Sequence, residues 1–258
     1  MTNNSKDTMV AIKDAAIVTV RNSSSRLPNK AIMKIKGDLR SIDIVIERAK
    51  KTGFPVIIAT STAASDDIFE QVAKQHNVQI FRGSLLNKLK RWYDCFNKFG
   101  IEYALLLDGD DLSSNYDIGS RAMLKLKSNK LDIVGNPENI VTGFFTYAMS
   151  RNAVVKLYNV APNDEINTDV IIRYIEKANL QISEIELQDY ECNKNIRLTL
   201  DYEDDLEFFR KLYENVDIRE SGKGIINYLE KNKSISEINF HRQKDFLKNQ
   251  AKFNEGVK

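Results

Sequence analysis

Short apolar runs alternate along the first half of the chain with segments whose apolar residues recur at helical spacing. The apolar runs predict buried strands at residues 15–20, 56–60, 79–81, 103–107 and 132–134. The segments between them predict helices at residues 41–52, 66–76 and 88–99. Strands that alternate with helices of about ten residues are typical of βαβ units. The pattern therefore predicts an α/β fold in which helices flank a mostly parallel sheet.

The second half has fewer apolar runs and more charged segments with helical spacing. Strands are expected at residues 144–149 and 197–200, the first of them in a small β-rich insertion or a subunit contact. Helices are expected at residues 169–178, 204–214, 223–231 and 236–249. No Pro-, Gly- or Ser-rich linker separates two units. We therefore expect a flexible N-terminal tail over residues 1–14 and a single domain over residues 15–258, helical from about residue 203.

Composition and charge restrict the partners of such a domain. The 38 Lys and Arg residues nearly balance the 36 Asp and Glu residues, which leaves no basic excess for broad binding to nucleic acid. Cys95 and Cys192 have neither metal-ligand nor disulfide spacing, so we expect reduced thiols in a cytoplasmic protein. No apolar run reaches the roughly 18 residues of a membrane span, and the polar start lacks a signal-peptide core. We expect small-molecule partners, and neither nucleic acid nor a membrane.

The loop after the first strand, residues 21–30 (RNSSSRLPNK), has the composition of an anion site. It contains three cations and three serines: Arg21, Arg26, Lys30, Ser23, Ser24 and Ser25. Small residues let successive backbone N–H groups surround an anion, and a turn could bring the cations together. Neither a Walker A loop nor a dinucleotide fingerprint is present. The loop therefore predicts phosphate binding, and the alternative is an ordinary polar loop with solvated charges.

A cluster of carboxylates follows the strand at residues 103–107. Asp108, Asp110 and Asp111 come directly after this apolar run, and Asp201 follows the expected strand at residues 197–200. Carboxylates are the ligands that Mg²⁺ uses together with substrate phosphates. Because ligands bind at the carboxyl ends of parallel strands, the phosphate loop and the acids should lie at one edge. The alternatives are a solvated turn for the first three acids and a helix N-cap for Asp201.

These segments resemble the cytidylyltransferases that activate acidic sugars, a group that includes the CMP-KDO and CMP-sialic acid synthetases. Residues 20–30 (VRNSSSRLPNK) are similar to its R-x-x-S-x-R-L-P-x-K signature. Residues 81–96 (FRGSLLNKLKRWYDCF) resemble F-R-G-S-x-x-N-V-L-x-R-[FWY], and residues 197–213 (RLTLDYEDDLEFFRKLY) resemble R-L-T-[VL]-D-x-x-E-D. Residues 109–112 (GDDL) stand where the group has G-D-x-P-L. The resemblance covers residues 15–245 and is closest to the SpsF-like spore coat polysaccharide branch.

The resemblance implies a Rossmann-like sheet of the nucleotide-diphospho-sugar transferase type, often in a homodimer, that uses CTP and Mg²⁺. Arg26 and Lys30 would act on the triphosphate as catalytic residues, and Asp110 and Asp201 would bind the metal. The nucleotide would contact residues of both the first and the third strand ends: Arg21, Ser23, Ser24, Ser25, Arg82, Gly83, Ser84 and Asn87. CMP would pass to a sugar, acidic sugar, phosphate or phosphonate acceptor, and pyrophosphate would leave. The pathway implied is surface polysaccharide or glycoconjugate synthesis.

The chain also departs from the family pattern. The Pro of G-D-x-P-L is absent, the loop at residues 113–121 (SSNYDIGSR) is unusual, and the first loop lacks glycine. These departures leave the acceptor open, and three further readings stay possible. One is a sugar-1-phosphate nucleotidyltransferase that uses GTP or UTP, and another is a non-catalytic nucleotide-binding homologue. The third is a glycosyltransferase, because Asp108 and Asp110 form a D-x-D sequence.

Overall fold

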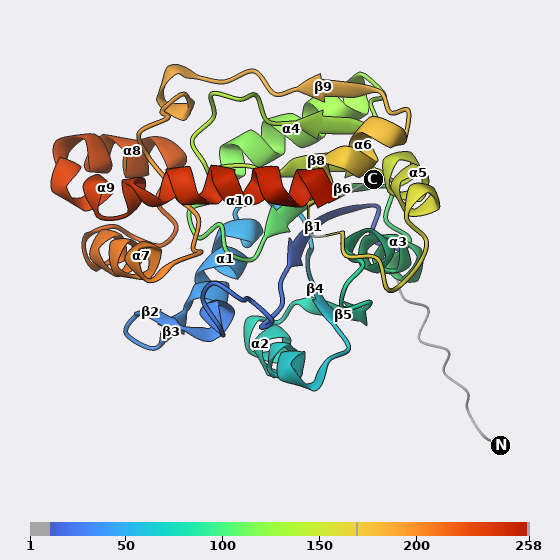
Figure 1. Cartoon of the computed structure of the whole chain (residues 1–258), viewed down its shortest axis with the longest axis horizontal. Helices are drawn as coiled ribbons and strands as arrows, with labels where there is room; N and C mark the ends of the chain where they lie inside the picture. The colour runs from blue at the N-terminus through green and yellow to red at the C-terminus, as the bar shows by residue number, and fades with distance from the viewer. Residues whose placement is uncertain (1–10, 169, 257–258) are drawn as a thin grey trace.

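A seven-stranded sheet forms the centre of the computed structural model, which describes residues 11–168 and 170–256 (Figure 1). Its strand order is β5-β4-β1-β6-β8-β7-β9. The strands are β1 (Asp14–Thr19), β4 (Val56–Ser61), β5 (Gln79–Gly83), β6 (Tyr103–Asp108), β7 (Ile133–Gly135), β8 (Tyr147–Ser150) and β9 (Ile182–Glu184). Only β8 runs antiparallel to its neighbours in this sheet. The predicted α/β fold with a mostly parallel sheet is confirmed.

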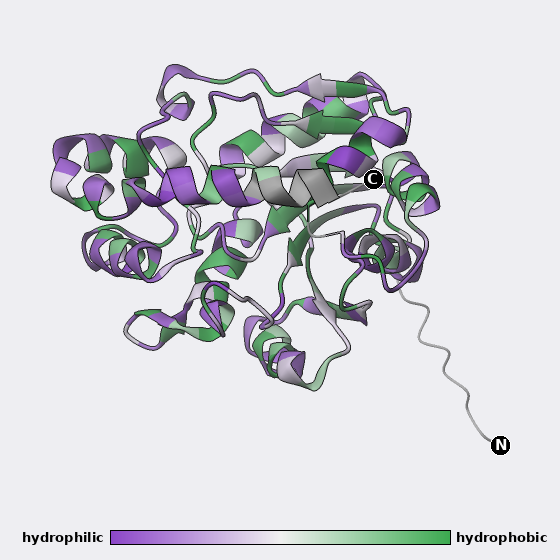
Figure 2. Cartoon of the chain, in the orientation of Figure 1, coloured by the Kyte–Doolittle hydropathy of each residue, from purple (hydrophilic) through white to green (hydrophobic). Residues whose placement is uncertain are grey.

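Helices cover both faces of the sheet because its strands are apolar on both sides. In β1, Ala16 and Val18 belong to one hydrophobic cluster, whereas Ala15 and Ile17 belong to the other. The first cluster packs on α1 (Ser41–Lys50), α2 (Ile68–His76) and α4 (Tyr116–Ser128). The second packs on α3 (Lys88–Phe99), α5 (Arg151–Val160) and α6 (Ile172–Lys177). Figure 2 shows hydrophobic colour along the central strands and both colours on the helices.

The chain is helical after residue 203, as expected. The helices are α7 (Glu203–Asn215), α8 (Gly222–Lys231), α9 (Lys233–Phe240) and α10 (Arg242–Gly256). The single helix expected at residues 236–249 is instead divided between α9 and α10 at His241. Buried residues of α7 and α8 join the cluster on the α1 face, and α10 crosses the front of the molecule in Figure 1. No helix of the described residues is long and apolar enough to cross a bilayer.

Two strand predictions are wrong in their placement. The β-rich insertion expected at residues 144–149 does not form, because β8 lies within the main sheet between β6 and β7. Phe144 and Phe145 are buried, so they offer no apolar surface to a partner subunit. Residues 197–200 are extended but form only one isolated bridge, between Thr142 and Arg197. Their N–H groups donate to two different loops, Leu198 to Thr142 and Leu200 to Asp110, so no ladder develops.

The pattern analysis did not identify β9 or the helices α4 and α5. Gly119 weakens the helical signal of α4. The structure needs glycine there, because a Cβ at this position would lie only 2.6 Å from Leu105 Cδ2 of β6. A small hairpin of β2 (Lys34–Lys36) and β3 (Leu39–Arg40) stands apart from the main sheet. The expected tail lies mostly outside the described residues. Its last part is bound to the end of α3, since the Ile12 N–H donates to the Phe99 carbonyl.

A network of charged side chains fixes α1 to its surroundings. The Asp43 carboxylate accepts hydrogen bonds from Arg40 and is 2.8 Å from His76 Nε2, and Glu47 contacts His76 and Arg219. Burial alone would raise the pKa of both carboxyls. At Asp43, hydrogen bonds from His76 and Arg40 outweigh this effect of burial. At Glu47, hydrogen bonds from Lys50, Arg219 and His76 do the same. They lower the pKa of Asp43 far below its usual range and that of Glu47 to about 2.

We predict that this network makes stability fall in acid. A carboxyl with a depressed folded-state pKa stabilises the fold above its unfolded pKa, and the contribution is lost as pH falls. For Glu47 the loss occurs between pH 4.5 and about 2. Asp43→Asn should lower the free energy of unfolding at pH 7 by about 1–3 kcal/mol and flatten its decline below pH 5, measured by urea titration. Asp38→Asn is the control, because its pair with Lys34 is exposed to solvent. An unchanged acid limb in Asp43→Asn would contradict the prediction.

Candidate active site

A cleft of about 780 Å³ opens at the carboxyl ends of β1 and β6. Its walls come from the loop after β1, the acidic loop after β6, residues 136–147 and α10. Eight of the site residues predicted from the sequence line it: Arg21, Ser23, Ser24, Ser25, Arg26, Lys30, Asp110 and Asp201. The loop after β1 and Asp110 meet at one edge of the sheet, as the strand-end argument predicts, and Asp201 joins them from a segment that is not a strand of the sheet.

The loop after β1 is anchored at both ends and open in the middle. At its start, the Asn22 N–H donates to Asp66, whose carboxylate also accepts from the Ser61 hydroxyl. At its end, the Leu27 N–H donates to the Ser24 hydroxyl, 3.3 Å away. Within the described chain, no main-chain N–H of residues 23–26 donates to a main-chain carbonyl. The residues that carry these donors line the cleft, and main-chain N–H groups without main-chain acceptors are typical of an anion site.

The two predicted metal carboxylates face each other across a single cation. Lys30 Nζ lies 2.5 Å from Asp110 Oδ2 and 3.0 Å from Asp201 Oδ1, and the Arg26 guanidinium contacts the same Asp201 oxygen. Burial alone would raise the pKa of Asp201, but Lys30, Arg26 and Arg197 outweigh it and hold this pKa low. Burial alone would lower the pKa of Lys30, and the two carboxylates raise it instead. Lys30 and Asp201 are therefore charged at neutral pH.

A buried Arg and a second Asp hold Asp201 in place. Arg197 donates to Asp201 Oδ2 at 2.8 Å and to Asp205 at 3.0 Å, and the side chains of all three residues are at most 1% exposed. The Asp205 carboxylate also accepts from the N–H groups of Asp201 and Tyr202. Tyr202 is the residue that precedes α7, so Asp201 is not the N-cap. Its carboxylate instead points at Arg26 and Lys30.

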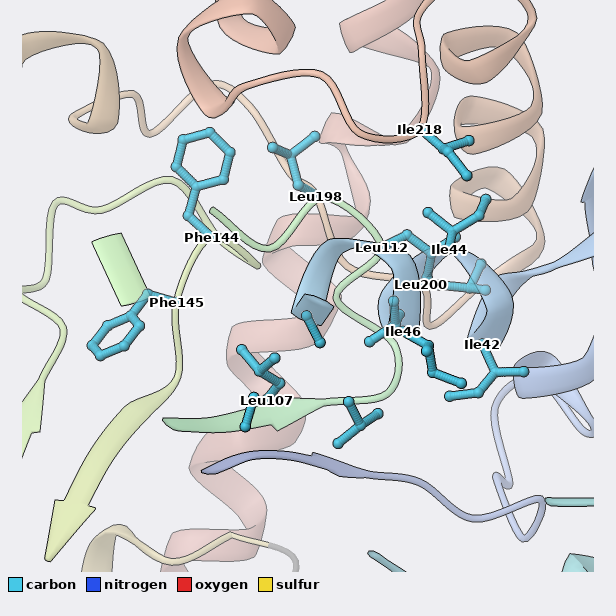
Figure 3. Packing of buried hydrophobic residues seen from close by; sticks show 14 of the residues in the cluster. Ile42, Ile44, Ile46, Leu107, Leu112, Phe144, Phe145, Leu198, Leu200 and Ile218 are labelled. Atoms are coloured by element: carbon cyan, nitrogen blue, oxygen red, sulfur yellow. The ribbon is translucent and has the colours of Figure 1, made fainter. Parts of the chain in front are cut away.

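The acidic loop after β6 is held by side chains of α1 and α7. The fully buried Arg48 donates to the Ser114, Ile218 and Glu220 carbonyls, and the Tyr213 hydroxyl donates to the Leu112 carbonyl. Leu112, which stands where the family pattern has Pro, is completely buried among residues of the α1 face (Figure 3). The atypical loop is therefore a packed element and not a solvated turn.

The other two acids of this loop, Asp108 and Asp111, also line the cleft. Burial raises the pKa of Asp108, and it raises that of Asp111 well above the usual value, with the charges of Asp110 and Asp108 adding to the effect. The Thr146 hydroxyl lies 3.4 Å from Asp108 and 3.5 Å from Asp111. Concentrated negative charge at a strand end favours a cation nearby.

The donor set fits a Mg²⁺ ion that also uses substrate oxygens. Asp110 and Asp201 supply carboxylate oxygens around the point that the Lys30 ammonium contacts. Across residues 11–168 and 170–256, no group of three or more His, Cys, Asp or Glu side chains could hold a metal by itself. Mg²⁺ is commonly bound by one or two carboxylates together with phosphates and water. Such a site would be complete only with a nucleotide bound.

Four predicted nucleotide-binding residues lie outside the cleft. Arg82 donates to the Ser61 and Ala63 carbonyls and pairs with Asp67 and Glu70. The Ser84 hydroxyl accepts from the Asn87 N–H. Asn87 is buried, caps α3 and donates to the Ala161 and Asn163 carbonyls, and Gly83 lies against Phe81. The contacts of these residues serve the fold around α2 and α3, and nucleotide contact by them stays a prediction.

The cleft also contains residues that the sequence did not single out for the site. They include Lys88, Thr146 and Thr199, and Gln243 and Phe246 from α10. Gln243 donates to the Thr142 hydroxyl at 3.0 Å, and the Arg197 guanidinium lies 4.9 Å from the centre of the Phe246 ring. The polar sequence of α10 carries no sign of this role. Lys88 could have been found, because the segment with F-R-G-S similarity places it at the start of a helix, beside Arg91, which matches the family segment.

Comparisons with known proteins agree with this geometry. The family model described as cytidylyltransferase matches residues 15–235. An uncharacterized protein of Methanocaldococcus jannaschii, MJ1063, is 29% identical over 91% of this chain and 98% of its own length. The spore coat polysaccharide biosynthesis protein SpsF of Bacillus subtilis is 24% identical over 84% of this chain and 93% of its own length.

Solved structures share the fold. A cytidylyltransferase from Leptospira borgpetersenii superimposes with a TM-score of 0.79 at 22% identity, covering 87% of this chain and 97% of that one. A CMP:2-keto-3-deoxy-manno-octonic acid synthetase complexed with CTP gives a TM-score of 0.60 at 17% identity, covering 78% and 98%. Since the family model spans most of the chain, including the phosphate loop and both carboxylates, this protein belongs to the cytidylyltransferase family and is a nucleotidyltransferase.

Proposed function

We propose that this protein transfers CMP from CTP to a small acceptor, with Mg²⁺ bound at Asp110 and Asp201 and with release of pyrophosphate. The observation that carries the proposal is the pairing of Lys30 with both carboxylates beside an open, serine-rich loop. The loop supplies N–H donors and cations for a triphosphate, and the carboxylates supply metal ligands. The family description and the CTP complex of a structural neighbour support CTP as the nucleotide.

Charge placement carries this mechanism, and no covalent intermediate with the protein is needed. Arg26 and Lys30 would hold the triphosphate and stabilise the negative charge of the departing pyrophosphate. Mg²⁺, when bound, neutralises charge on the phosphate oxygens. Arg197 keeps Asp201 oriented toward the cleft, and the loop positions the α-phosphate for attack by an acceptor oxygen. Lys30 must exchange its carboxylate contacts for phosphate contacts when the nucleotide binds.

The acceptor and its pathway follow from the relatives. SpsF is described as a spore coat polysaccharide biosynthesis protein, and the structural neighbour acts on an acidic sugar by its name. We therefore propose an acceptor of sugar, acidic-sugar, phosphate or phosphonate type and a role in polysaccharide or glycoconjugate synthesis. A cytoplasmic location and a homodimer, without nucleic acid or membrane partners, complete the proposal.

The choice of nucleotide is tested by thermal shift with each of the four ribonucleoside triphosphates plus Mg²⁺. A ligand that binds the native state raises the melting temperature by mass action. We expect CTP to give the largest increase. A larger increase with GTP or UTP would support the sugar-1-phosphate alternative and contradict the CTP assignment. Strong CTP binding without pyrophosphate release from any acidic sugar or phosphonate would favour a non-catalytic homologue.

Asp110→Asn should abolish most of the reaction, because it removes a charged metal ligand and a partner of Lys30. We expect pyrophosphate release to fall by about 10²–10³-fold, the usual cost of losing one charge-stabilising group. The Mg²⁺ dependence of CTP binding should weaken in the same variant. Asp117→Asn, an exposed position on α4, is the matched control and should retain wild-type rates. Full activity of Asp110→Asn would disprove the metal assignment.

Arg197→Met should destabilise the protein as well as the site. It leaves Asp201 and Asp205 buried without their shared cation, and breaking buried pairs in this way costs about 3–5 kcal/mol. Urea unfolding measures the loss. Arg210→Met on the exposed side of α7 is the control, and it should change stability by less than about 0.5 kcal/mol. If Arg197→Met lowers the free energy of unfolding as little as the control does, Arg197 does not stabilise the buried Asp201.

A further inference from the structure

The cleft contains a cation, Lys88, that the proposed triphosphate and metal site does not use. Lys88, the first residue of α3, lines the cleft, and its side chain is only 12% exposed. Its ammonium lies 5.3 Å from the centre of the Trp92 ring and 3.9 Å from Asp108 Oδ1, which is too far for a hydrogen bond. No residue that the structure describes accepts a hydrogen bond from it. A mostly buried ammonium with unused donors at a cleft wall is suited to bind an anion.

The surroundings of Lys88 add positive charge. Arg91, one turn further along α3, also lines the cleft and donates to the Ser84 carbonyl at 2.6 Å. Arg21 and Arg91 both donate to the Leu85 carbonyl, so the two guanidinium groups share one neighbourhood. Asp108 Oδ1, at 3.9 Å, is the only carboxylate oxygen of the described residues within 4 Å of the Lys88 ammonium. This wall of the cleft therefore favours a negatively charged ligand.

Lys88 and Lys30 lie on opposite faces of the sheet, at the edge where the cleft opens. Trp92 Nε1 donates to the Thr19 hydroxyl, and α3 packs on the cluster that contains Ile17 and Leu106. Leu112 and Leu200, which adjoin the metal carboxylates, belong to the cluster on the α1 face. Nucleotidyl transfer places the attacking and leaving oxygens roughly in line across the phosphorus. If pyrophosphate leaves on the Lys30 side, the acceptor enters from the side of α3.

We infer that Lys88 is a specificity-determining residue, whose ammonium binds an oxyanion of the acceptor: a carboxylate, phosphate or phosphonate. This inference rests on the proposed function and narrows the acceptor to a charged one. The family segment that residues 81–96 resemble has Val at this position, so the charge belongs to this chain and is not part of the general CTP site. Neutral sugars would lack the group that Lys88 recognises.

Titration calorimetry with two small oxyanions tests the inference. Methylphosphonate is the phosphonate probe and acetate is the carboxylate probe. Each is titrated with and without Mg²⁺ and α,β-methylene-CTP, which cannot release pyrophosphate. Lys88→Met should raise the Kd of the preferred oxyanion at least tenfold while the Kd of the nucleotide stays within twofold. Lys88→Arg should restore oxyanion binding. Lys90→Met on the same helix is the matched control, because Lys90 pairs with Asp94 and does not line the cleft.

The outcomes separate this inference from the proposed function. Equal oxyanion binding in Lys88→Met and the wild type overturns it, as does the absence of oxyanion binding in the wild type. Weaker nucleotide binding in Lys88→Met with unchanged oxyanion binding assigns Lys88 to CTP and overturns it too. Failure of all variants to bind the nucleotide contradicts the proposed function, and the titrations without nucleotide still decide the role of Lys88. A preference for methylphosphonate or acetate identifies the acid.

Discussion

Charge compensation around one buried carboxylate organises this molecule. Asp201 is almost fully buried and contacts three cations, Arg26, Lys30 and Arg197, which come from the first loop and from the strand-like segment before α7. Removing a charge from water is tolerated only when partners replace the lost hydration. Each partner therefore constrains the others: Lys30 connects Asp201 to the acidic loop, and Arg197 connects it to Asp205. The catalytic edge of the sheet and the C-terminal helices thereby become one structure.

This arrangement explains how the proposed metal site can exist before a nucleotide binds. In the protein alone, the Lys30 ammonium pairs with both Asp110 and Asp201, so one cation bridges the two facing carboxylates. A nucleotide that arrives with Mg²⁺ brings both a cation for the carboxylates and phosphates for Lys30. The exchange keeps the number of charge pairs nearly constant, which limits the electrostatic cost of binding. The Lys88 ammonium takes no part in this exchange, so it stays available to bind the second substrate.

The sequence predicted the sheet and the first-loop side of the site well, because both depend on local signals. Apolar strands and the residues that directly follow them determine where Arg26, Lys30 and Asp110 lie. The packing of side chains in three dimensions decided the rest. Arg197 was expected in a strand at residues 197–200, but its guanidinium is buried and donates to Asp201 and Asp205, which lie four and eight residues further along the chain. Arg82 looked like a ligand-binding cation, yet neighbouring carbonyls and acids occupy it. The contribution of α10 to the cleft has no counterpart in its polar sequence.

The buried Arg48 has a consequence for how the molecule opens. Its guanidinium holds the carbonyls of Ser114, Ile218 and Glu220 at once, so it joins the acidic loop to the chain between α7 and α8. If either segment moves away, it breaks hydrogen bonds to the same Arg48 guanidinium that holds the other segment. Local opening free energies follow such shared contacts, and segments that share them open together. The loop that carries Asp110 is thus no independent flap but part of the same cooperative unit as the C-terminal helices.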